Sequence, residues 1–311
     1  MINIPNPSSG IKLLLLLISL LFAFFLTVWT SNDFLRYTEI VNRSNGLDFL
    51  SYYEIGRYEV GSSFIFWFVG QFPSPNVGLL LIIFISLYIK QCIFSRHLHY
   101  ATLAFIAYVL IFAHILDANQ IRAALASCFI LYALLIEPRK NYTYLLLALI
   151  GMIFHYSAIF ILCLYLSRRP ITALIILVIS SYLYIDILSN FEFARIYILE
   201  LKGHANLTSS FFLIQCIISI TGFTIWNKLT ITQKRGLLFS SIGVVVYLIF
   251  NDTPMIAHRV RELSMLGIFP LLFYEKQKLT YVNLIWIMCV IYFITYSLFK
   301  IFKEFLLVYF L

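Results

Sequence analysis

Residues 13–30 read LLLLLISLLFAFFLTVWT, a run without a charged side chain that directly follows Lys12. An α-helix needs about 20 such residues to cross the hydrocarbon core of a bilayer. The run is too long for the apolar core of a signal peptide and lacks a small-residue cleavage site, so we expect an uncleaved first membrane helix. Further apolar runs follow at 60–72, 76–94, 99–116, 121–136, 142–166, 170–188, 210–226, 236–250, 260–274 and 280–299.

The composition supports the same interpretation. Of 311 residues, 62% are hydrophobic and 12% are charged, whereas soluble domains are close to half apolar and a quarter charged, so an ordinary soluble or disordered chain is excluded. In lipid each backbone polar group must be paired within its own segment, which makes these runs helices. The sequence therefore predicts an all-α, polytopic integral membrane protein with 10–11 hydrophobic segments in a single transmembrane domain, residues 1–311.

The net charge of +8 is spread over short loops, which is typical of membrane orientation and not of a nucleic-acid partner. The basic loops contain Arg96, Arg139–Lys140, Arg168–Arg169, Lys228–Arg235 and Lys276–Lys278. All of them can be cytoplasmic if residues 60–75 form a re-entrant half-helix and residues 142–166 form a hairpin broken near His155. The long loops 31–59 and 189–209 then lie outside, with nearly all of the acidic residues, and we expect the chemistry on that side.

Several chemical signatures are missing from the sequence. The five cysteines lie in apolar runs without a CxxC or Cys/His cluster, which predicts neither disulfides nor a metal site. There is no P-loop, GxGxxG, GxSxG or HExxH motif and no DxD-like carboxylate pair. We therefore expect no cofactor and no bound nucleotide.

Polar residues in two outer regions are candidates for a functional site. In loop 31–59, Asp33, Arg57 and Glu59 lie among tyrosines, a mixture that suits sugar binding, although tyrosines also collect at membrane interfaces. Arg122 stands at the outer end of an apolar run, just after the turn-forming residues DANQ (117–120) that separate two runs and one turn after Asn119. An intramembrane arginine marks either a functional site or a buried ion pair, for instance with Asp117.

Two further candidates lie later in the chain. His155 is at the centre of run 142–166, where it could bond a freed backbone carbonyl or act as a general acid or base. His258, Arg259 and Arg261 lie where an outer turn leads into the run 260–274, and on a helix His258, Arg261 and Glu262 would share a face. Arginines there could snorkel or pair with Glu262, or hold a diphosphate, for which the planar guanidinium is well matched.

Four motifs in this order resemble the EpsG/Wzy family of bacterial polysaccharide polymerases, over roughly residues 30–270. They are YEVG (58–61), NQIRAALA (119–126), FHYSAIF (154–160) after a basic loop, and AHRVRELSML (257–266). Val60 departs from the proline that is commoner in the first motif. The resemblance implies a fold like that of membrane-embedded, GT-C-like glycosyltransferases.

The resemblance also implies a glycosyltransferase in the bacterial cytoplasmic (inner) membrane, with an active site that faces the periplasm or exterior. It would polymerise oligosaccharide repeat units linked to undecaprenyl diphosphate, as in O-antigen, capsule or exopolysaccharide synthesis. Donor and acceptor would both be lipid-linked glycans. A chain-length regulator and a flippase are the protein partners that this activity suggests.

The resemblance suggests a role for each candidate residue. Arg122 and either Arg259 or Arg261 would hold the diphosphate and stabilise the growing charge, and Glu59 or His155 would accept the proton of the attacking hydroxyl. The remaining substrate-binding candidates are Asp33, Arg57, Asn119 and His258. A lipid-linked glycan ligase, another membrane glycosyltransferase, a flippase or transporter, and a membrane scaffold remain alternatives.

Overall fold

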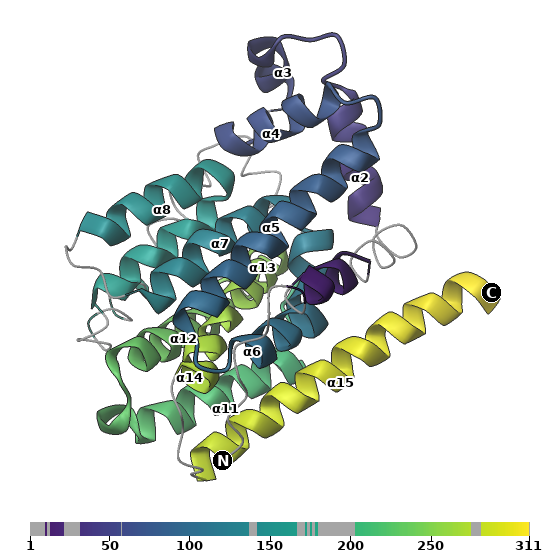
Figure 1. Ribbon diagram of the computed structural model, residues 1–311. Coiled ribbons are helices and arrows are strands. Elements are labelled where there is room, and N and C mark those ends of the chain that lie inside the picture. The colour runs from purple at the N-terminus through teal and green to yellow at the C-terminus, as the bar shows by residue number, and fades with distance from the viewer. Residues whose placement is uncertain are drawn as a thin grey trace. The chain divides into compact units, whose positions relative to one another are not determined.

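The computed structural model describes residues 13–21, 32–56, 58–136, 142–166, 203–274 and 281–310, with positions 10, 172, 175, 178 and 179. Throughout these residues the chain forms helices joined by turns, and the described part contains no strand (Figure 1). The prediction of an all-α protein is confirmed. The apolar run 170–188 and most of loop 189–209 lie outside the described residues.

Three helices in the described ranges are long and apolar enough to cross a membrane. They are α5 (Pro75–His97), α6 (Ala101–Tyr108) continued by the π-helix η1 (Val109–Ala118), and α15 (Tyr281–Phe310) over its first 19 residues. Shorter apolar helices are α4 (Val60–Gly70), α7 (Ile121–Leu135), α8 (Tyr142–Phe154), the 3₁₀ helix η2 (Tyr156–Leu166) and α11 (Ser210–Thr224). The chain is a multi-pass membrane protein, as its apolar runs predict.

The two runs expected to be unusual are indeed short or broken. Helix α4 has 11 residues, or about 16 Å at 1.5 Å per residue, roughly half of a 30 Å hydrocarbon core. Run 142–166 is interrupted at His155, where α8 has ended and η2 has not yet begun. The break is therefore confirmed, while the re-entrant path of α4 and the sidedness of the loops stay predictions.

The described chain forms two compact units. The first comprises Met1–Tyr132, Leu146–Ile159 and Val290–Leu311, and the second comprises Ala133–Leu145 and Phe160–Cys289.

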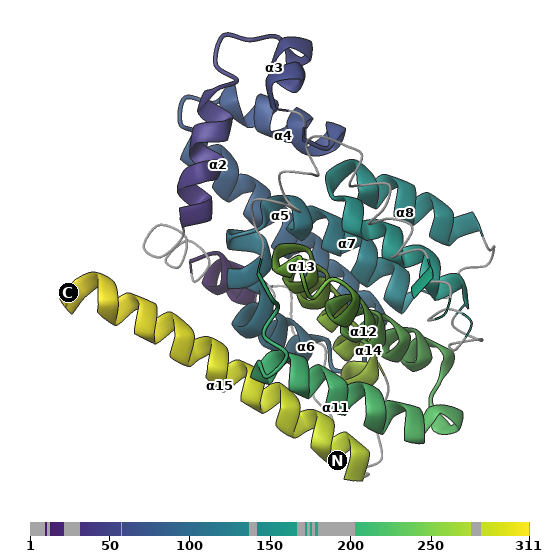
Figure 2. The same cartoon turned by 180° about the vertical axis from the view of Figure 1, so that it is seen from behind.

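In the first unit, the segment 31–59 that we expected to be a loop contains two helices, α2 (Asn32–Asn42) and α3 (Phe49–Gly56). Both gather with α4 at the N-terminal end of α5 (Figures 1 and 2). Helix α2 forms because Phe34, Ile40 and Val41 recur at helical spacing and are buried on one face. The other face of α2 carries many polar residues, so the composition of this segment alone indicates a loop.

A short turn joins α2 to α3. Asp48 precedes α3 and accepts hydrogen bonds from the backbone N–H and the hydroxyl of Ser51, and these bonds lower the pKa of the Asp48 carboxyl. Gly46 has φ +76°, which a side chain would strain. The Trp67 indole on α4 donates to the Leu47 carbonyl at 2.9 Å, so the turn is fixed to α4.

The second unit is built around α12. Its helices and short 3₁₀ turns are α11, η3 (Trp226–Lys228), α12 (Ile231–Ile249), α13 (Pro254–Ser264), η4 (Met265–Gly267) and α14 (Ile268–Phe273). Helix α12 packs against α11, α13 and α14 (Figure 2). A Cβ on Gly243 would lie 1.7 Å from the Ser264 Oγ, and one on Gly236 would lie 2.4 Å from the Gly267 carbonyl oxygen. Glycine thus permits the close helix contacts that are common in membrane proteins.

Helix α12 begins earlier than the apolar pattern predicts. A capping box between Thr230 and Gln233 starts it, so Arg235, which we expected in a cytoplasmic loop, lies inside the helix. Arg235 is buried and donates to the Ile136 carbonyl. Its guanidinium also lies 5.6 Å from the centre of the Tyr144 ring.

Candidate active site

The YEVG motif forms the entry to α4 in the first unit. Glu59 is the residue before the helix, and its side chain is only 4% exposed. A carboxylate at this position is favoured by the positive end of the helix dipole. Gly61 brings the motif against the end of α8, since a Cβ there would lie 2.4 Å from the Ile153 Cγ2 and 3.0 Å from the Ile153 carbonyl oxygen.

The NQIR motif meets the YEVG motif through an ion pair. Arg122, in the first turn of α7, donates from Nη1 to the Glu59 Oε2 at 2.6 Å. The Tyr58 ring lies beneath the guanidinium, 4.9 Å from centroid to Cζ, and Tyr37 lies close to the same group. The Arg122 side chain is 16% exposed, so a second ligand can still reach it. Asp117, which we considered as the partner of Arg122, pairs with another residue.

The FHYSA motif forms the break between α8 and η2. The Ser157 N–H approaches the His155 Nδ1 at 3.3 Å, and the Ser157 hydroxyl lies 2.7 Å from the same nitrogen. The Ala158 N–H donates to the His155 carbonyl at 3.0 Å. Because a backbone N–H can only donate, Nδ1 is the acceptor in the contact with the Ser157 N–H. His155 thus binds a backbone N–H of the turn through Nδ1, and its bond to a freed backbone carbonyl stays a prediction.

Three of the four motifs therefore lie together in the first unit. Ser62, one residue after the YEVG motif, donates to the Phe154 carbonyl at 2.7 Å, which fixes the start of α4 beside the His155 turn. The Glu59–Arg122 bond joins the third motif to them. This arrangement brings a buried carboxylate, a partly exposed guanidinium and two tyrosine rings into one place, and such a group of side chains can accept a proton and bind an anion.

The fourth motif forms its own cluster in the second unit. Arg261 on α13 is buried, donates to the Ser209 Oγ at 3.1 Å, and lies 4.9 Å from the centre of the Tyr247 ring. His258 contacts the same tyrosine edge to face at 5.3 Å, so the shared helix face that the spacing predicts is present. Burial and the neighbouring Arg261 lower the pKa of His258. Arg259 is half-buried and makes no ion pair or hydrogen bond to the described chain.

The sequence profile of the EpsG family matches residues 11–311, which is nearly the whole chain. The chain belongs to the EpsG family. It is accordingly a polysaccharide-polymerase-like membrane protein. No curated protein and no solved structure matches it significantly.

Several expected site residues of this EpsG family member stay predictions. Arg57 and the side chain of Asp33 lie outside the described residues. Asn119 ends the π-helix η1, three residues before Arg122, and is partly exposed.

One buried charge pair escaped the sequence analysis. Lys90 lies in the apolar run 76–94 and its Nζ is 2.6 Å from the Asp117 Oδ1, with both side chains fully buried. Asp117 was expected in a turn at 117–120, yet it lies inside η1. A lysine within an apolar run is itself the signal that could have revealed this pair.

Proposed function

We propose that this EpsG family protein is a glycosyltransferase that polymerises lipid-linked oligosaccharide repeat units at the outer face of the bacterial cytoplasmic membrane. Its donor and acceptor would be glycans on undecaprenyl diphosphate. The observation that carries the proposal is the Glu59–Arg122 pair beside the His155 turn, which joins three family motifs at one partly open site.

In the proposed reaction, a hydroxyl of the incoming repeat unit attacks the anomeric carbon of the growing glycan. A new carbon–oxygen bond forms between the sugars, and the bond from the anomeric carbon to the diphosphate oxygen breaks. The hydroxyl proton passes to the Glu59 carboxylate, and undecaprenyl diphosphate leaves with the bonding electrons. Glu59 is the better base of our two candidates, because the Nδ1 of His155 is engaged by Ser157.

Charge development at the leaving diphosphate needs fixed cations. Arg122 is suited to this role because its guanidinium is held at one nitrogen by Glu59 and is partly exposed. When Glu59 takes the proton, it loses its negative charge, and the attraction of Arg122 to the diphosphate is no longer opposed. Within the fourth motif, Arg259 is better suited than Arg261 to bind an anionic ligand, because Arg261 is enclosed by Tyr247 and bonded to Ser209.

The remaining candidates take supporting roles in this proposal. Asn119 and His258 would bind substrate, as would Arg57 and Asp33. The tyrosines Tyr37 and Tyr58 beside Arg122 provide rings on which sugar can stack. A chain-length regulator and a flippase are the proposed protein partners, since a polymerase at this face needs translocated repeat units and a means of ending the chain.

The test uses purified protein in vesicles supplied with lipid-linked repeat units on the outer side. Wild-type protein should produce a ladder of polymer lengths, and Arg122→Ala should produce none while inserting at the normal level. His204→Asn/Asp252→Asn, which removes an exposed ion pair in the second unit, is the matched control and should give the normal ladder.

Other outcomes would assign another function. Transfer of a finished glycan to a second acceptor without lengthening would identify a ligase. Movement of labelled lipid-linked sugar across the membrane without any glycan product would identify a flippase or transporter. A normal ladder from Arg122→Ala would refute the proposed role of the ion pair.

A further inference from the structure

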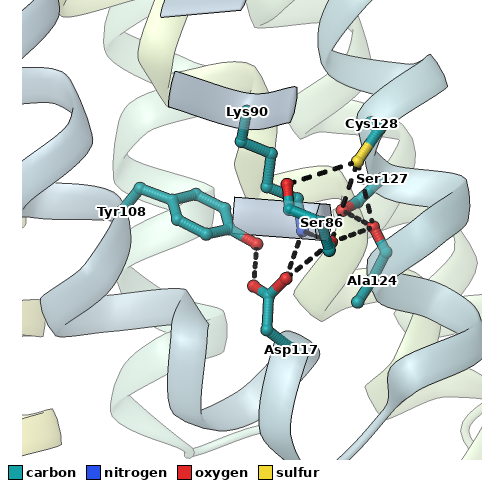
Figure 3. Close-up of polar contacts among 7 residues, drawn as sticks. All are labelled: Ser86, Lys90, Tyr108, Asp117, Ala124, Ser127 and Cys128. Atoms are coloured by element: carbon teal, nitrogen blue, oxygen red, sulfur yellow. Dashed lines mark hydrogen bonds and ion pairs between the residues drawn. The ribbon is translucent and has the colours of Figure 1, made fainter. Parts of the chain in front are cut away.

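The first unit contains a second charge pair that the proposed reaction does not use. Lys90 on α5 and Asp117 near the end of η1 lie 2.6 Å apart, Nζ to Oδ1, with both side chains fully buried (Figure 3). Removing two charges from water opposes burial strongly, so such a pair is poorly explained by stability alone. A buried pair is better suited to specifying one arrangement of the elements that carry it.

The Asp117 carboxylate is held from two sides. Its Oδ1 also accepts a hydrogen bond from the Ser86 Oγ at 2.7 Å, and Ser86 lies one turn before Lys90 on α5. Its Oδ2 accepts from the Tyr108 hydroxyl at 2.5 Å, at the junction of α6 and η1. Both oxygens are thus fixed by three donors, as Figure 3 shows.

The same cluster also reaches the first turns of α7. The Ala124 carbonyl lies 3.3 Å from the Ser86 Oγ and accepts from the Cys128 Sγ at 3.5 Å. Ser86 therefore contacts Asp117, five residues before Arg122, and Ala124, two residues after it. Between these contacts, only Asn119 and Gln120 separate the π-helix from α7. Helices with π geometry are rare and occur often at functional sites.

We propose that Lys90 and Asp117 are positioning residues that hold segment 117–124 so that the Arg122 guanidinium meets Glu59. Arg122 bonds Glu59 through a single nitrogen, so a small displacement of the segment breaks the bond. The proposal rests on the proposed function for its effect on catalysis. Its effect on the segment itself does not depend on that function.

The test replaces the pair by apolar residues, Lys90→Met/Asp117→Leu, which removes both buried charges together. We expect normal insertion and a melting temperature close to that of the wild type. Turnover in the polymerisation assay should fall by about tenfold or more, with KM for the donor within about twofold. Amide hydrogen exchange over 118–124, measured without substrate, should rise by about tenfold, whereas exchange in α12 should stay unchanged.

A second variant keeps the test decisive if the double variant does not accumulate. Asp117→Glu retains the charge but moves the carboxylate by one methylene group, and it should show the same fall in turnover. His204→Asn/Asp252→Asn, at the exposed pair, should change neither readout.

Wild-type turnover and wild-type exchange over 118–124 would overturn the positioning role. Unchanged exchange with lowered turnover would also overturn it, because the effect would then not pass through the segment. If Arg122→Ala polymerises normally while the pair still controls exchange, the proposed function fails and the positioning of the segment stands.

Discussion

Replacing Gly61 with alanine tests whether the close approach of α4 to α8 sets the geometry of the Glu59–Arg122 pair. The added Cβ would lie 2.4 Å from the Ile153 Cγ2, so the two must separate by about 1.0 Å to reach the 3.4 Å of an ordinary contact. Overpacking of this kind costs about 1–3 kcal/mol. Because Glu59 is two residues away, most of the shift should pass to its bond with Arg122.

A misplacement of about 1 Å near reacting groups lowers rates by about 100-fold. We therefore expect Gly61→Ala to insert normally but to extend glycan chains about 100-fold more slowly, measured as repeat units added per minute in vesicles. Gly203→Ala is the matched control, since a Cβ there meets its nearest neighbour, a Pro254 ring carbon, at 3.7 Å.

A second substitution gives the prediction a rescue. Ile153→Ala removes the clashing Cγ2 from a side chain that is 46% exposed, so by itself it should have little effect. In Gly61→Ala/Ile153→Ala, the Ile153 carbonyl and Phe154 ring stay close, at 3.0 and 3.2 Å, and recovery should be partial, to within about tenfold of wild type. Wild-type extension by Gly61→Ala alone, or no rescue by the second change, would refute the reasoning.

Three other predictions concern the two histidine clusters. Because His155 organises a turn and is not the proposed base, His155→Asn should keep polymer extension within about tenfold of wild type, and loss of all product would contradict this. Ser157→Ala removes the hydroxyl partner of His155 and should lower the melting temperature. Arg261→Gln should lower the melting temperature by several degrees, because Arg261 is buried against Tyr247. Arg259→Gln should raise KM for the lipid-linked donor and leave the melting temperature unchanged. The reverse pattern would exchange the roles of the two arginines. The pKa of His258 is lowered in the folded protein, so the unfolded chain binds a proton at this residue more readily. The stability of the folded protein should therefore fall as the pH drops below about 6.5. In a series of melting temperatures measured at decreasing pH, His258→Gln should flatten that fall.

The sequence was sufficient to predict the all-helical membrane fold and the break at His155. Both rest on local features, namely the length of each apolar run and a polar residue between two basic loops. It also identified Glu59 and Arg122 as separate candidates. It could not pair them, because their contact joins positions 63 residues apart and a sequence does not reveal which anion a buried cation meets.

Two misinterpretations have a common physical cause. Segment 31–59 was interpreted as a loop because of its polar residues, although Phe34, Ile40 and Val41 mark a buried helix face. Asp117 was placed in an outer turn, and Lys90 was passed over within its apolar run, although each neutralises the other in the interior. In both cases the average polarity of a segment was misleading. The spacing of apolar residues and the pairing of opposite charges decide where a polar residue can be buried.

The proposed catalytic pair is tested most directly by measuring donor binding and chain extension together for the Glu59→Gln variant in one vesicle preparation. Glutamine keeps the size of the side chain and can still accept the Arg122 hydrogen bond, but it cannot take the proton of the attacking hydroxyl. We predict donor binding within about twofold of wild type and chain extension slower by about 100-fold or more. Extension at the wild-type rate would contradict the assignment of Glu59 as the base.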